Sequence, residues 1–346
     1  MPGFANSSAV SQFSGDFNGL FRRVNPQMNA LDRFMRAQVD CFEPEIRGMA
    51  AYCLDTSGKR LRPILVFACG WQGEGVVSEE LVRAAGIVEM VHLATLVHDD
   101  IMDGADLRRN RRTAAREFGT DAAVLLGDAL FSQALHVAAQ FPTTEVCRLV
   151  ARSTRQVCSG EIMQTLRRRD LNISVDEYRR MIDLKTAELF RTSCFLGARL
   201  SGQGEPFVKA ADRFGHHLGI AYQIYDDLAD FLGDEARIGK TLGTDLATGK
   251  LTLPLMLLLE QVSPGERDGL AAAMREGKAV ELTASRQRMA QFGIAGKVRA
   301  AIEVELEAAA RDLGGFGDFP AVPLMMDLLA ALKSQISALQ TSVPAG

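Results

Sequence analysis

The chain is 346 residues long, and its composition is that of an ordinary globular protein. Hydrophobic residues make up 47% and charged residues 24% of it, which excludes a largely disordered or collagen-like chain. The 39 basic and 43 acidic residues give a formal net charge of −4. Bulk charge therefore favours neither nucleic acid nor an anionic membrane surface as a partner, and any basic site must be local.

The cysteines and the apolar stretches predict a soluble cytoplasmic protein. The six cysteines include no Cys-x-x-Cys pair, which is typical of reduced thiols rather than of a disulfide framework or a zinc site. The N-terminus lacks the basic start and apolar core of a signal peptide. The longest apolar stretches, such as residues 251–259, are far shorter than the ~20 residues that cross a bilayer, so we expect no transmembrane segment.

The order of segments along the chain predicts an all-α fold. Residues 1–20 are rich in Ser, Asn, Gly and Phe without a helical period, so we expect a flexible N-terminal arm. From about Val24 onward, apolar residues recur at helical spacing in segments of roughly 15–25 residues. Short breaks of Gly, Pro or charged residues separate these segments, and no segment alternates with period two. Residues 21–346 are predicted to form a single all-α domain.

The first basic cluster comes before the first strongly apolar run. Residues 58–63 read Gly-Lys-Arg-Leu-Arg-Pro and precede the apolar residues 64–69. This order places Lys59 and Arg62 at the start of a helix, where backbone N–H groups also favour an anion.

The segment 79–103 carries a polar stripe on an otherwise apolar helix. Its apolar residues go nearly all the way round, so the helix should be buried. His92, Thr95, Asp99 and Asp103 nevertheless step by 3, 4 and 4 residues, which puts them on one face. Residues 99–103 read Asp-Asp-x-x-Asp, so the first and last carboxylates lie one helical turn apart.

The segment 207–234 repeats this pattern, with Gln223, Asp226, Asp230 and Asp234 at the same spacing. Buried carboxylates repel one another and are costly to desolvate, so a helix interior keeps them only where cations neutralise them. Carboxylates without histidine favour Mg²⁺ over zinc, and Mg²⁺ completes its octahedron with water and phosphate oxygens. One such motif could be a solvated helix end, but two on buried helices predict a magnesium-bound diphosphate.

Further cations lie between and after the two acidic motifs. One group follows the first motif directly, one lysine precedes Thr186 inside the helical segment 175–200, and two lysines frame a Gly-rich loop. Each group alone could be solvated surface, but together they supply enough positive charge for two separate diphosphates. They are Arg108, Arg109, Arg111, Arg112, Lys185, Lys240 and Lys250.

In this order the motifs resemble those of the trans-isoprenyl diphosphate synthases, also called polyprenyl synthetases. The resemblance covers about residues 50–260. It rests on both acidic motifs and on these shorter motifs in chain order: residues 58–63, His92, Arg108-Arg109, Gly127-Asp128, Gly160-Glu161 with Gln164, Lys185-Thr186, Gln223, Gly233-Asp234 and residues 239–250. It implies an isoprenoid-synthase-type barrel of antiparallel helices around a central cavity, usually in a homodimer.

The resemblance also implies Mg²⁺-dependent head-to-tail condensation of isopentenyl diphosphate with allylic diphosphates. About three Mg²⁺ would be held by carboxylates, and the oxygens of two polar side chains would face the allylic cation while the departing diphosphate takes the proton. The metal ligands would be Asp99, Asp103, Asp226 and Asp230. The residues facing the allylic cation would be Lys185, through its carbonyl, with Thr186 and Gln223. The allylic diphosphate would contact Arg108, Lys185 and Lys240, with Lys250 as a further substrate-binding residue. Isopentenyl diphosphate would contact Lys59, Arg62, His92 and Arg109.

Other residues of these motifs have supporting roles in this interpretation. Asp100 and Asp227 lie about 100° round the helix from their neighbours, so we expect them to bind protein groups rather than metal. His98 is predicted to pack and hydrogen-bond in the core. Glu161 and Gln164 lie one turn apart, and could either orient a neighbour or touch metal-bound water.

The chain departs from the family pattern after the first acidic motif. The family usually continues Arg-Arg-Gly-x-Pro-Thr, whereas this chain has Asn110 and Arg112 at the Gly and Pro positions. Asn can adopt the left-handed turn that Gly would adopt. The missing proline predicts a less rigid loop.

The product length is predicted from the residues before the first acidic motif. In this family the product grows down the cavity, and bulky side chains about one helical turn before the first Asp act as a floor. Here these positions are Ala94 and Thr95, ~6–7.5 Å along the helix axis from Asp99. Neither side chain can block much, so we expect a product longer than farnesyl (C15).

Two alternatives remain at this point. A terpene cyclase ionises an allylic diphosphate with similar carboxylates, but it needs neither Lys59 and Arg62 nor a second acidic motif. A non-catalytic subunit of a hetero-oligomeric prenyl synthase could keep the fold alone, but such subunits can lose acidic motifs that this chain has kept.

Overall fold

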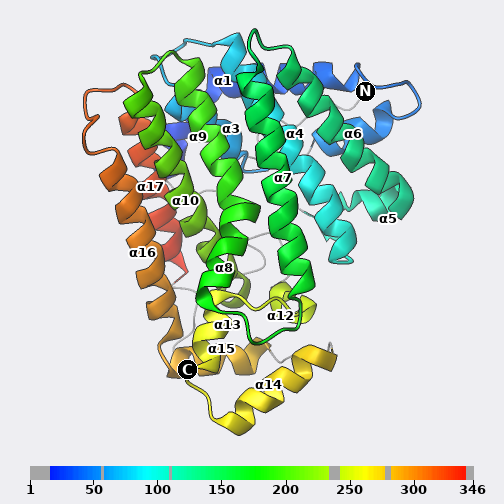
Figure 1. Ribbon diagram of the computed structural model, residues 1–346, viewed down its shortest axis with the longest axis vertical. Helices are drawn as coiled ribbons and strands as arrows, with labels where there is room; N and C mark the ends of the chain where they lie inside the picture. Colours follow the sequence, from blue (N-terminus) through cyan, green and yellow to red (C-terminus); the bar gives the residue numbers. More distant parts are fainter. Residues whose placement is uncertain (1–15, 56–57, 109–110, 234–241, 277–281, 340–346) are drawn as a thin grey trace. The chain divides into compact units, whose positions relative to one another are not determined.

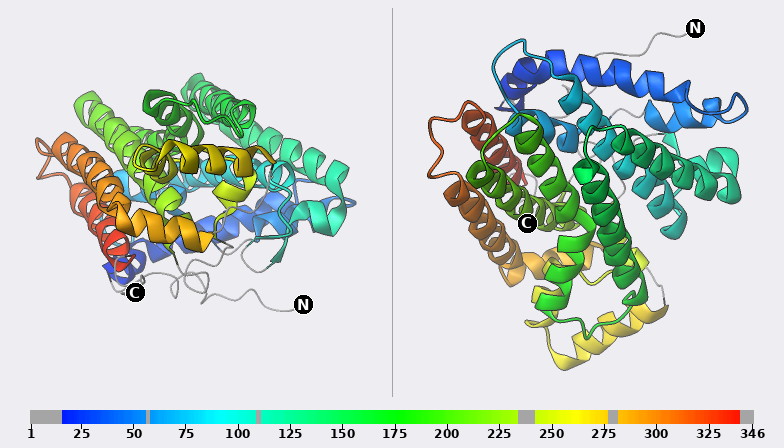
Figure 2. Two further views of the ribbon diagram at one scale, coloured as in Figure 1. Left: turned by 90° about the horizontal axis from the view of Figure 1, so that it is seen from below. Right: turned by 45° about the horizontal axis from the view of Figure 1, so that its top comes forward.

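The computed structural model describes residues 16–55, 58–108, 111–233, 242–276 and 282–339. They are built almost entirely from helices (Figure 1), as two further views also show (Figure 2), which confirms the all-α prediction. Within these residues the β structure is one antiparallel hairpin of β1 (Leu107–Arg108) and β2 (Arg111–Arg112). Its strands are too short to give the alternating pattern by which a strand is recognised in a sequence.

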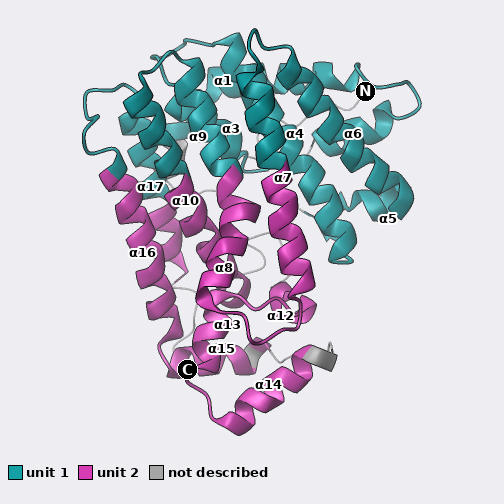
Figure 3. Ribbon diagram, viewed as in Figure 1, with its two compact units in different colours: residues 1–154, 189–215, 312–331 teal, residues 155–188, 216–311, 332–346 magenta. Residues whose placement is uncertain are grey.

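The chain divides into two compact units, each built from three stretches of sequence (Figure 3). Unit 1 comprises residues 1–154, 189–215 and 312–331, and unit 2 comprises residues 155–188, 216–311 and 332–346. Three of the five borders fall well inside α7 (Thr144–Leu166), α10 (Glu205–Leu232) and α17 (Val322–Ala338), and the other two fall at the first residue of α9 (Glu188–Leu200) and the last residue of α16 (Ile294–Asp312). The single domain expected for residues 21–346 stays a prediction.

Unit 1 is organised around α4 (Glu79–Met102), which is buried on nearly all sides. This helix packs against α1 (Asp16–Val39), α3 (Leu61–Cys69) and α6 (Thr120–Ala139). Its start is defined by Ser78, whose hydroxyl accepts from the backbone N–H of Leu81. The unit also contains α2 (Arg47–Leu54), α5 (Ala114–Phe118) and nearly all of α9 (Glu188–Leu200). The helix with the first acidic motif is thus the core of its unit, as its all-round apolar pattern predicts.

The first helix begins earlier than the sequence predicts. Helix α1 starts at Asp16, so the last residues of the expected arm 1–20 are helical, and Leu20 is buried. Residues 1–15 lie outside the described residues.

Unit 2 holds the second acidic motif and the loop that follows it. Helix α8 (Val175–Ile182) begins with a capping box in which Ser174 and Glu177 exchange hydrogen bonds, and it continues into a π-helical turn, η2 (Asp183–Ala187). Buried Glu305 ties three helices together: it pairs with Arg179 of α8 and lies 2.7 Å from Nδ1 of His217 of α10. The remaining elements are α12 (Thr244–Thr248), α13 (Leu253–Leu259), α14 (Pro264–Glu276), α15 (Leu282–Gln291) and α16 (Ile294–Asp312).

Two of the described helices, α4 and α6, are long and apolar enough to cross a membrane by length and composition alone. In α4, 72% of the most apolar window is buried inside the structure, as in the core helix of a soluble protein; in α6 the share is 39%. Polar residues interrupt the apolar runs of both helices, so no unbroken apolar stretch marks either of them in the sequence. The absence of a transmembrane segment stays a prediction.

Candidate active site

The first acidic motif occupies the last turn of α4, and its middle carboxylate is turned into the protein. Buried Asp100 accepts hydrogen bonds from Nε of Arg108 at 2.8 and 2.9 Å, and Nη2 of Arg108 lies 2.7 Å from its Oδ1. Asp99 and Asp103 are half-buried. Burial by itself lowers the pKa of Arg108. The hydrogen bonds and charge of Asp100, together with the charges of Asp99 and Asp103, outweigh this effect and raise the pKa above its ordinary value. Arg108 thus neutralises the motif from within unit 1.

His98 packs and hydrogen-bonds between helices of unit 1, as predicted, although its side chain is partly exposed rather than in the core. Its Nε2 lies 3.0 Å from the carbonyl oxygen of Val124 on α6, and because a carbonyl only accepts, this nitrogen carries the proton. A Cβ atom on Gly127 would lie 2.2 Å from the same Nε2. The Gly127-Asp128 motif therefore includes a glycine that makes room for the histidine beside Asp99.

The basic cluster lies at the start of α3, as predicted. Arg60 adopts a left-handed backbone with φ of 45° and forms an ion pair with Asp32 of α1. Half-buried Lys59 and Arg62 flank this strained residue, and the guanidinium of Arg62 lies over the ring of Phe190, 5.1 Å from its centroid. The Asp32 pair compensates for a conformation that a residue other than glycine rarely adopts.

The loop after the first motif forms the β hairpin despite its missing proline. Arg112, at the usual proline position, donates from Nη2 to the carbonyl of Arg116 at 2.5 Å, and its Nη1 lies 3.4 Å from Glu117. Thr113 then caps α5 by accepting from the backbone N–H of Arg116, and its hydroxyl donates to the carbonyl of Ala105 at 2.9 Å. The predicted substrate ligand Arg109, with Asn110, lies outside the described residues.

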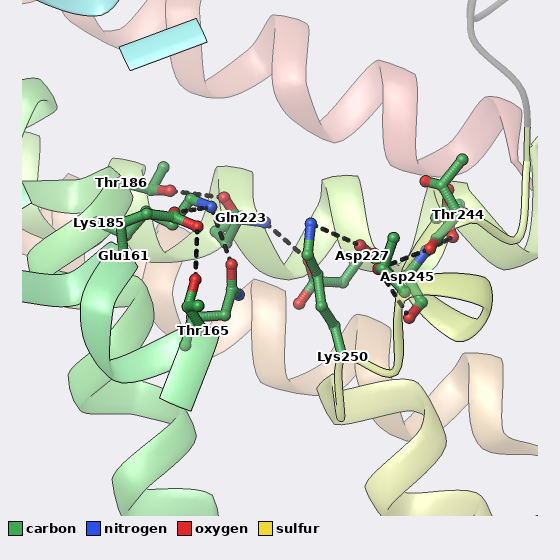
Figure 4. Close-up of polar contacts among 12 residues, drawn as sticks. Glu161, Thr165, Lys185, Thr186, Gln223, Asp227, Thr244, Asp245 and Lys250 are labelled. Atoms are coloured by element: carbon green, nitrogen blue, oxygen red, sulfur yellow. Dashed lines mark hydrogen bonds and ion pairs between the residues drawn. The ribbon is translucent and has the colours of Figure 1, made fainter. Parts of the chain in front are cut away.

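In the second motif, on α10, the last two carboxylates are buried and bound to protein donors, and Figure 4 shows Asp227 beside Gln223. Asp227 accepts from the Tyr178 hydroxyl at 2.6 Å and from Nε2 of Gln223 at 2.7 Å. Asp230 accepts from the Thr244 hydroxyl at 3.0 Å and from the backbone N–H of Asp245 at 3.1 Å, which fixes the start of α12. Asp226 is the half-buried member of the motif.

Asp227 has an unusual environment for a carboxylate. Burial and the nearby charge of Asp245 raise its pKa to about 8, against the opposing effect of the hydrogen bonds from Tyr178 and Gln223. Burial, followed by the charge of Asp227, also raises the pKa of Tyr178. The prediction that Asp100 and Asp227 bind protein groups is confirmed, but Asp100 faces a cation whereas Asp227 faces a hydroxyl and an amide.

The predicted catalytic residues Lys185 and Thr186 lie on the π-helical turn η2, an irregularity that is frequent at functional sites. The Lys185 ammonium pairs with Glu161 and donates to Oε1 of Gln164 at 2.8 Å. A Cβ on Gly160 would lie 2.5 Å from the backbone N of Lys185, so only glycine lets α7 pass this close to η2. Of the two roles left open for Glu161 and Gln164, the structure supports the orienting role.

The loop lysine Lys250 lies beside the second motif. Its Nζ is 3.9 Å from Oδ1 of Asp245, and Figure 4 shows the Lys250 side chain on the same side as this carboxylate. Lys250 also lines a small hollow together with Gln164, Tyr178 and Thr252. The other loop lysine, Lys240, and Asp234 lie outside the described residues.

The donor set fits a hard divalent cation that needs oxygens from its ligand. Within the described stretches, no three His, Cys, Asp or Glu side chains form a ready-made metal cage. The half-buried carboxylates Asp99, Asp103 and Asp226 offer oxygen donors only, which suits Mg²⁺ with part of its octahedron supplied by water and phosphate oxygens.

Two residues of this site were missed in the sequence. Tyr178 looks like a core residue of an amphipathic helix, although it lies seven residues before Lys185 and so on the same face two turns away. Asp245 was considered only as part of a Gly-rich loop, although it adds a half-buried carboxylate next to Asp227 and Lys250.

Comparisons with known proteins agree on one family. Residues 43–288, which include both acidic motifs, match the sequence model described as Polyprenyl synthetase. Octaprenyl diphosphate synthase of Haemophilus influenzae is 33% identical over 270 residues, 78% of this chain and 77% of that protein. Heptaprenyl diphosphate synthase component 2 of Geobacillus stearothermophilus is 38% identical over 210 residues, covering 61% and 65%. A polyprenyl synthase from Caulobacter crescentus, complexed with calcium and isoprenyl diphosphate, superposes with a TM-score of 0.85 and 28% identity over 95% of this chain and 99% of that one.

The raised pKa of Asp227 predicts a pH-dependent stability in the absence of divalent cations. Because the folded-state pKa, about 8, lies above the ordinary value of 3.8, the folded protein binds the extra proton between these limits. The free energy of unfolding therefore falls as pH rises through this range. Asp227→Asn has no carboxyl proton to lose. Its free energy of unfolding relative to wild type should therefore rise by up to ~1.4 kcal/mol for each unit of increasing pH. Urea denaturation in a chelator from pH 5.5 to 8.5 measures this difference, with exposed Asp268→Asn as the control. Parallel profiles for wild type and Asp227→Asn would contradict the assignment.

Proposed function

The chain belongs to the polyprenyl synthetase family, and we propose that its two acidic motifs hold the Mg²⁺-bound diphosphate of an allylic substrate during chain elongation. The enzyme is a prenyltransferase that makes polyprenyl diphosphates longer than C15, like the heptaprenyl and octaprenyl diphosphate synthases among its relatives. Its fold is the isoprenoid synthase fold. The observation that carries the proposal is that Asp99, Asp103 and Asp226 are half-buried oxygen donors at the two acidic motifs, whereas Asp100 and Asp227 are buried.

About three Mg²⁺ would be held by these carboxylates and by the substrate's diphosphate. Asp99, Asp103 and Asp226 are the first candidates. Asp230 already accepts two hydrogen bonds, and it stays a candidate through the lone pairs that these bonds leave. Bound Mg²⁺ neutralises the leaving diphosphate and so lowers the barrier to breaking the allylic C–O bond.

The basic residues are assigned to two diphosphates. One group, which includes the two basic residues at the start of α3, would bind isopentenyl diphosphate, and the strained Arg60 supports this by presenting its neighbours at a helix start. The others would bind the allylic diphosphate, and the contacts of Lys185 with Glu161 and Gln164 support a pre-oriented ammonium. The first group is Lys59, Arg62, His92 and Arg109; the second is Arg108, Lys185, Lys240 and Lys250.

For the reaction itself, the protein would mainly position the two substrates and stabilise the positive charge of the allylic cation. The oxygens of Thr186 and Gln223, with the carbonyl of Lys185, would face the allylic cation and stabilise its positive charge. The π-helical turn supports this, because its widened backbone changes the hydrogen bonding of the carbonyls around Lys185. The homoallylic double bond of isopentenyl diphosphate would attack the cation, and the departing diphosphate would take the proton released.

The enzyme is proposed to be cytoplasmic and homodimeric. None of the six cysteines, all of which lie within the described residues, forms a disulfide, which suits a reducing compartment. Helix α6 exposes Val124 and Leu125, the latter by 67%, on an apolar helix of low burial, and a second copy of this chain would cover them.

Substrate turnover tests the assigned chemistry directly. With Mg²⁺, isopentenyl diphosphate and allylic primers of several lengths, the wild type should release diphosphate and elongate the primer. Asp99→Asn and Asp226→Asn should each lower kcat by roughly 10²–10³-fold, because each removes a ligand that stabilises the leaving group. Exposed Asp268→Asn is the matched control. Diphosphate release without elongation would indicate a terpene cyclase, and absence of turnover would indicate a non-catalytic subunit.

The product length should depend on Ala94. This residue lies on α4 about one helical turn before Asp99, the position at which, by the family resemblance, a large side chain would act as a floor for the growing product. Ala94→Phe should shorten the main product, while Ala94→Ser, which adds one oxygen, should leave it unchanged. Chromatography of the dephosphorylated products measures both. An unchanged product with Ala94→Phe would show that other helices set the length.

The oligomeric state should depend on α6. Sedimentation equilibrium of the wild type should give twice the 37.6 kDa mass of the chain. Leu125→Glu places a charge on the exposed apolar face and should shift the mass toward the monomer. A wild-type monomer, or a dimer unaffected by this substitution, would contradict the proposed role of α6.

A further inference from the structure

We propose that Tyr178 is a positioning residue of this enzyme: through the carboxylate of Asp227 it fixes the amide of Gln223 and, through that amide, the hydroxyl of Thr186. The inference rests on the proposed function, because Gln223 and Thr186 are the groups assigned there to face the allylic cation. Tyr178 itself would touch neither substrate nor cation.

Four side chains from three elements of unit 2 form one continuous hydrogen-bonded chain. The Tyr178 hydroxyl lies 2.6 Å from Oδ2 of Asp227, and Nε2 of Gln223 lies 2.7 Å from Oδ1 of the same carboxylate. Oγ1 of Thr186 lies 2.6 Å from Oε1 of Gln223. Figure 4 shows Gln223 between Thr186 and Asp227. We refer to these four residues as the Tyr178 relay.

The amide group of Gln223 sets the direction of the hydrogen bonds in the relay. Its Nε2, which can only donate, faces Oδ1 of Asp227, so this oxygen accepts whether or not the carboxyl group carries a proton on Oδ2. The amide oxygen of Gln223 must then face Thr186, whose hydroxyl has to donate its hydrogen to it. The lone pairs of Thr186 are thereby left for the side away from Gln223, where a positive charge would be stabilised.

Burial makes this arrangement depend on Tyr178. Tyr178 is 2% and Asp227 3% exposed, so bulk solvent does not reach this hydrogen bond and losing it is costly. Without the phenol hydroxyl, Oδ2 of Asp227 loses the donor that holds the plane of the carboxylate. The amide of Gln223 is then free to rotate, and with it the donor direction of Thr186. Loss of the Tyr178 hydroxyl should therefore lower the rate of the chemical step.

Tyr178→Phe tests the start of the relay, since it removes one oxygen atom and leaves the ring. The expected result is a kcat about tenfold lower, as for the loss of one buried hydrogen bond, with the KM for isopentenyl diphosphate unchanged. Ser193→Ala is the matched control, because its fully buried hydroxyl donates to the carbonyl of Leu189 at 2.7 Å outside the relay. It should keep wild-type kcat. An unchanged kcat in folded Tyr178→Phe overturns the proposal.

A double-mutant cycle separates positioning from a merely structural role. Thr186→Val removes the end of the relay, so in that background Tyr178→Phe should lower kcat by less than twofold instead of about tenfold. Independent effects of the two substitutions, which would multiply, overturn the proposal. Thr186→Ser, which keeps the hydroxyl, should restore the full sensitivity to Tyr178→Phe.

A second variant covers the case in which Tyr178→Phe does not fold. Asp227→Asn keeps the shape of the side chain but can present NH₂ as well as oxygen to Gln223, so it removes the fixed direction of the relay. It should lower kcat, be coupled to Thr186→Val in the same way, and leave the Mg²⁺ concentration for half-maximal rate unchanged. A raised Mg²⁺ requirement with no coupling overturns the relay. Absence of condensation by the wild type overturns the proposed function instead, so the two failures are distinguishable.

Discussion

The cost of burying carboxylates inside helices is the constraint on which this structure depends. Each acidic motif lies on a long helix that is largely buried, and in each motif the middle carboxylate is turned into the protein. Asp100 is neutralised by a cation, since Arg108 approaches it with three contacts of 2.7–2.9 Å. Asp227 has a hydroxyl and an amide as partners, and its raised pKa shows that these partners compensate burial only in part. The two motifs are alike in sequence, but their charge is balanced by different means.

Because of this difference, the carboxylates hold different groups in place in the two units. In unit 1 the guanidinium of Arg108 holds the hairpin to the end of α4, so the first motif is coupled to the loop that carries the following basic residues. In unit 2, Asp227 and Asp230 use their oxygens to position protein groups: the amide of Gln223 in one case and the loop at Thr244 and Asp245 in the other. A motif of three carboxylates is therefore both a candidate metal site and an organiser of the polar groups around it. Substitution of the middle carboxylate tests the second role separately from the first.

Much of the fold and the outline of the site could be predicted from the sequence, because they depend on periodicity and spacing. The all-round apolar pattern of residues 79–103 indicated a core helix, and the one-turn spacing of the acidic residues placed them on one face. The hairpin at Leu107 and Arg112 could not be predicted, since two-residue strands have no period. Tyr178 could not be assigned either, because its role follows from a contact with Asp227, 49 residues away in the chain. Spacing predicts which residues share a helix face, and it says little about which faces meet.

The π-helical turn at Lys185 shows how one glycine can support a whole site. A regular helix would place Lys185 and Thr186 about 100° apart and bond every carbonyl within the helix. The π turn changes that bonding, and it is accommodated only because α7 passes it at Gly160, where no Cβ could fit against the backbone N of Lys185. One turn further along the same face of α7, Gln164 binds the Lys185 ammonium, with Glu161 beside it. The close approach that the glycine permits is thus the reason that two polar side chains of α7 can reach the lysine. The irregular backbone of η2, the glycine of α7 and the oriented ammonium of Lys185 thus meet at a single helix–helix contact within unit 2.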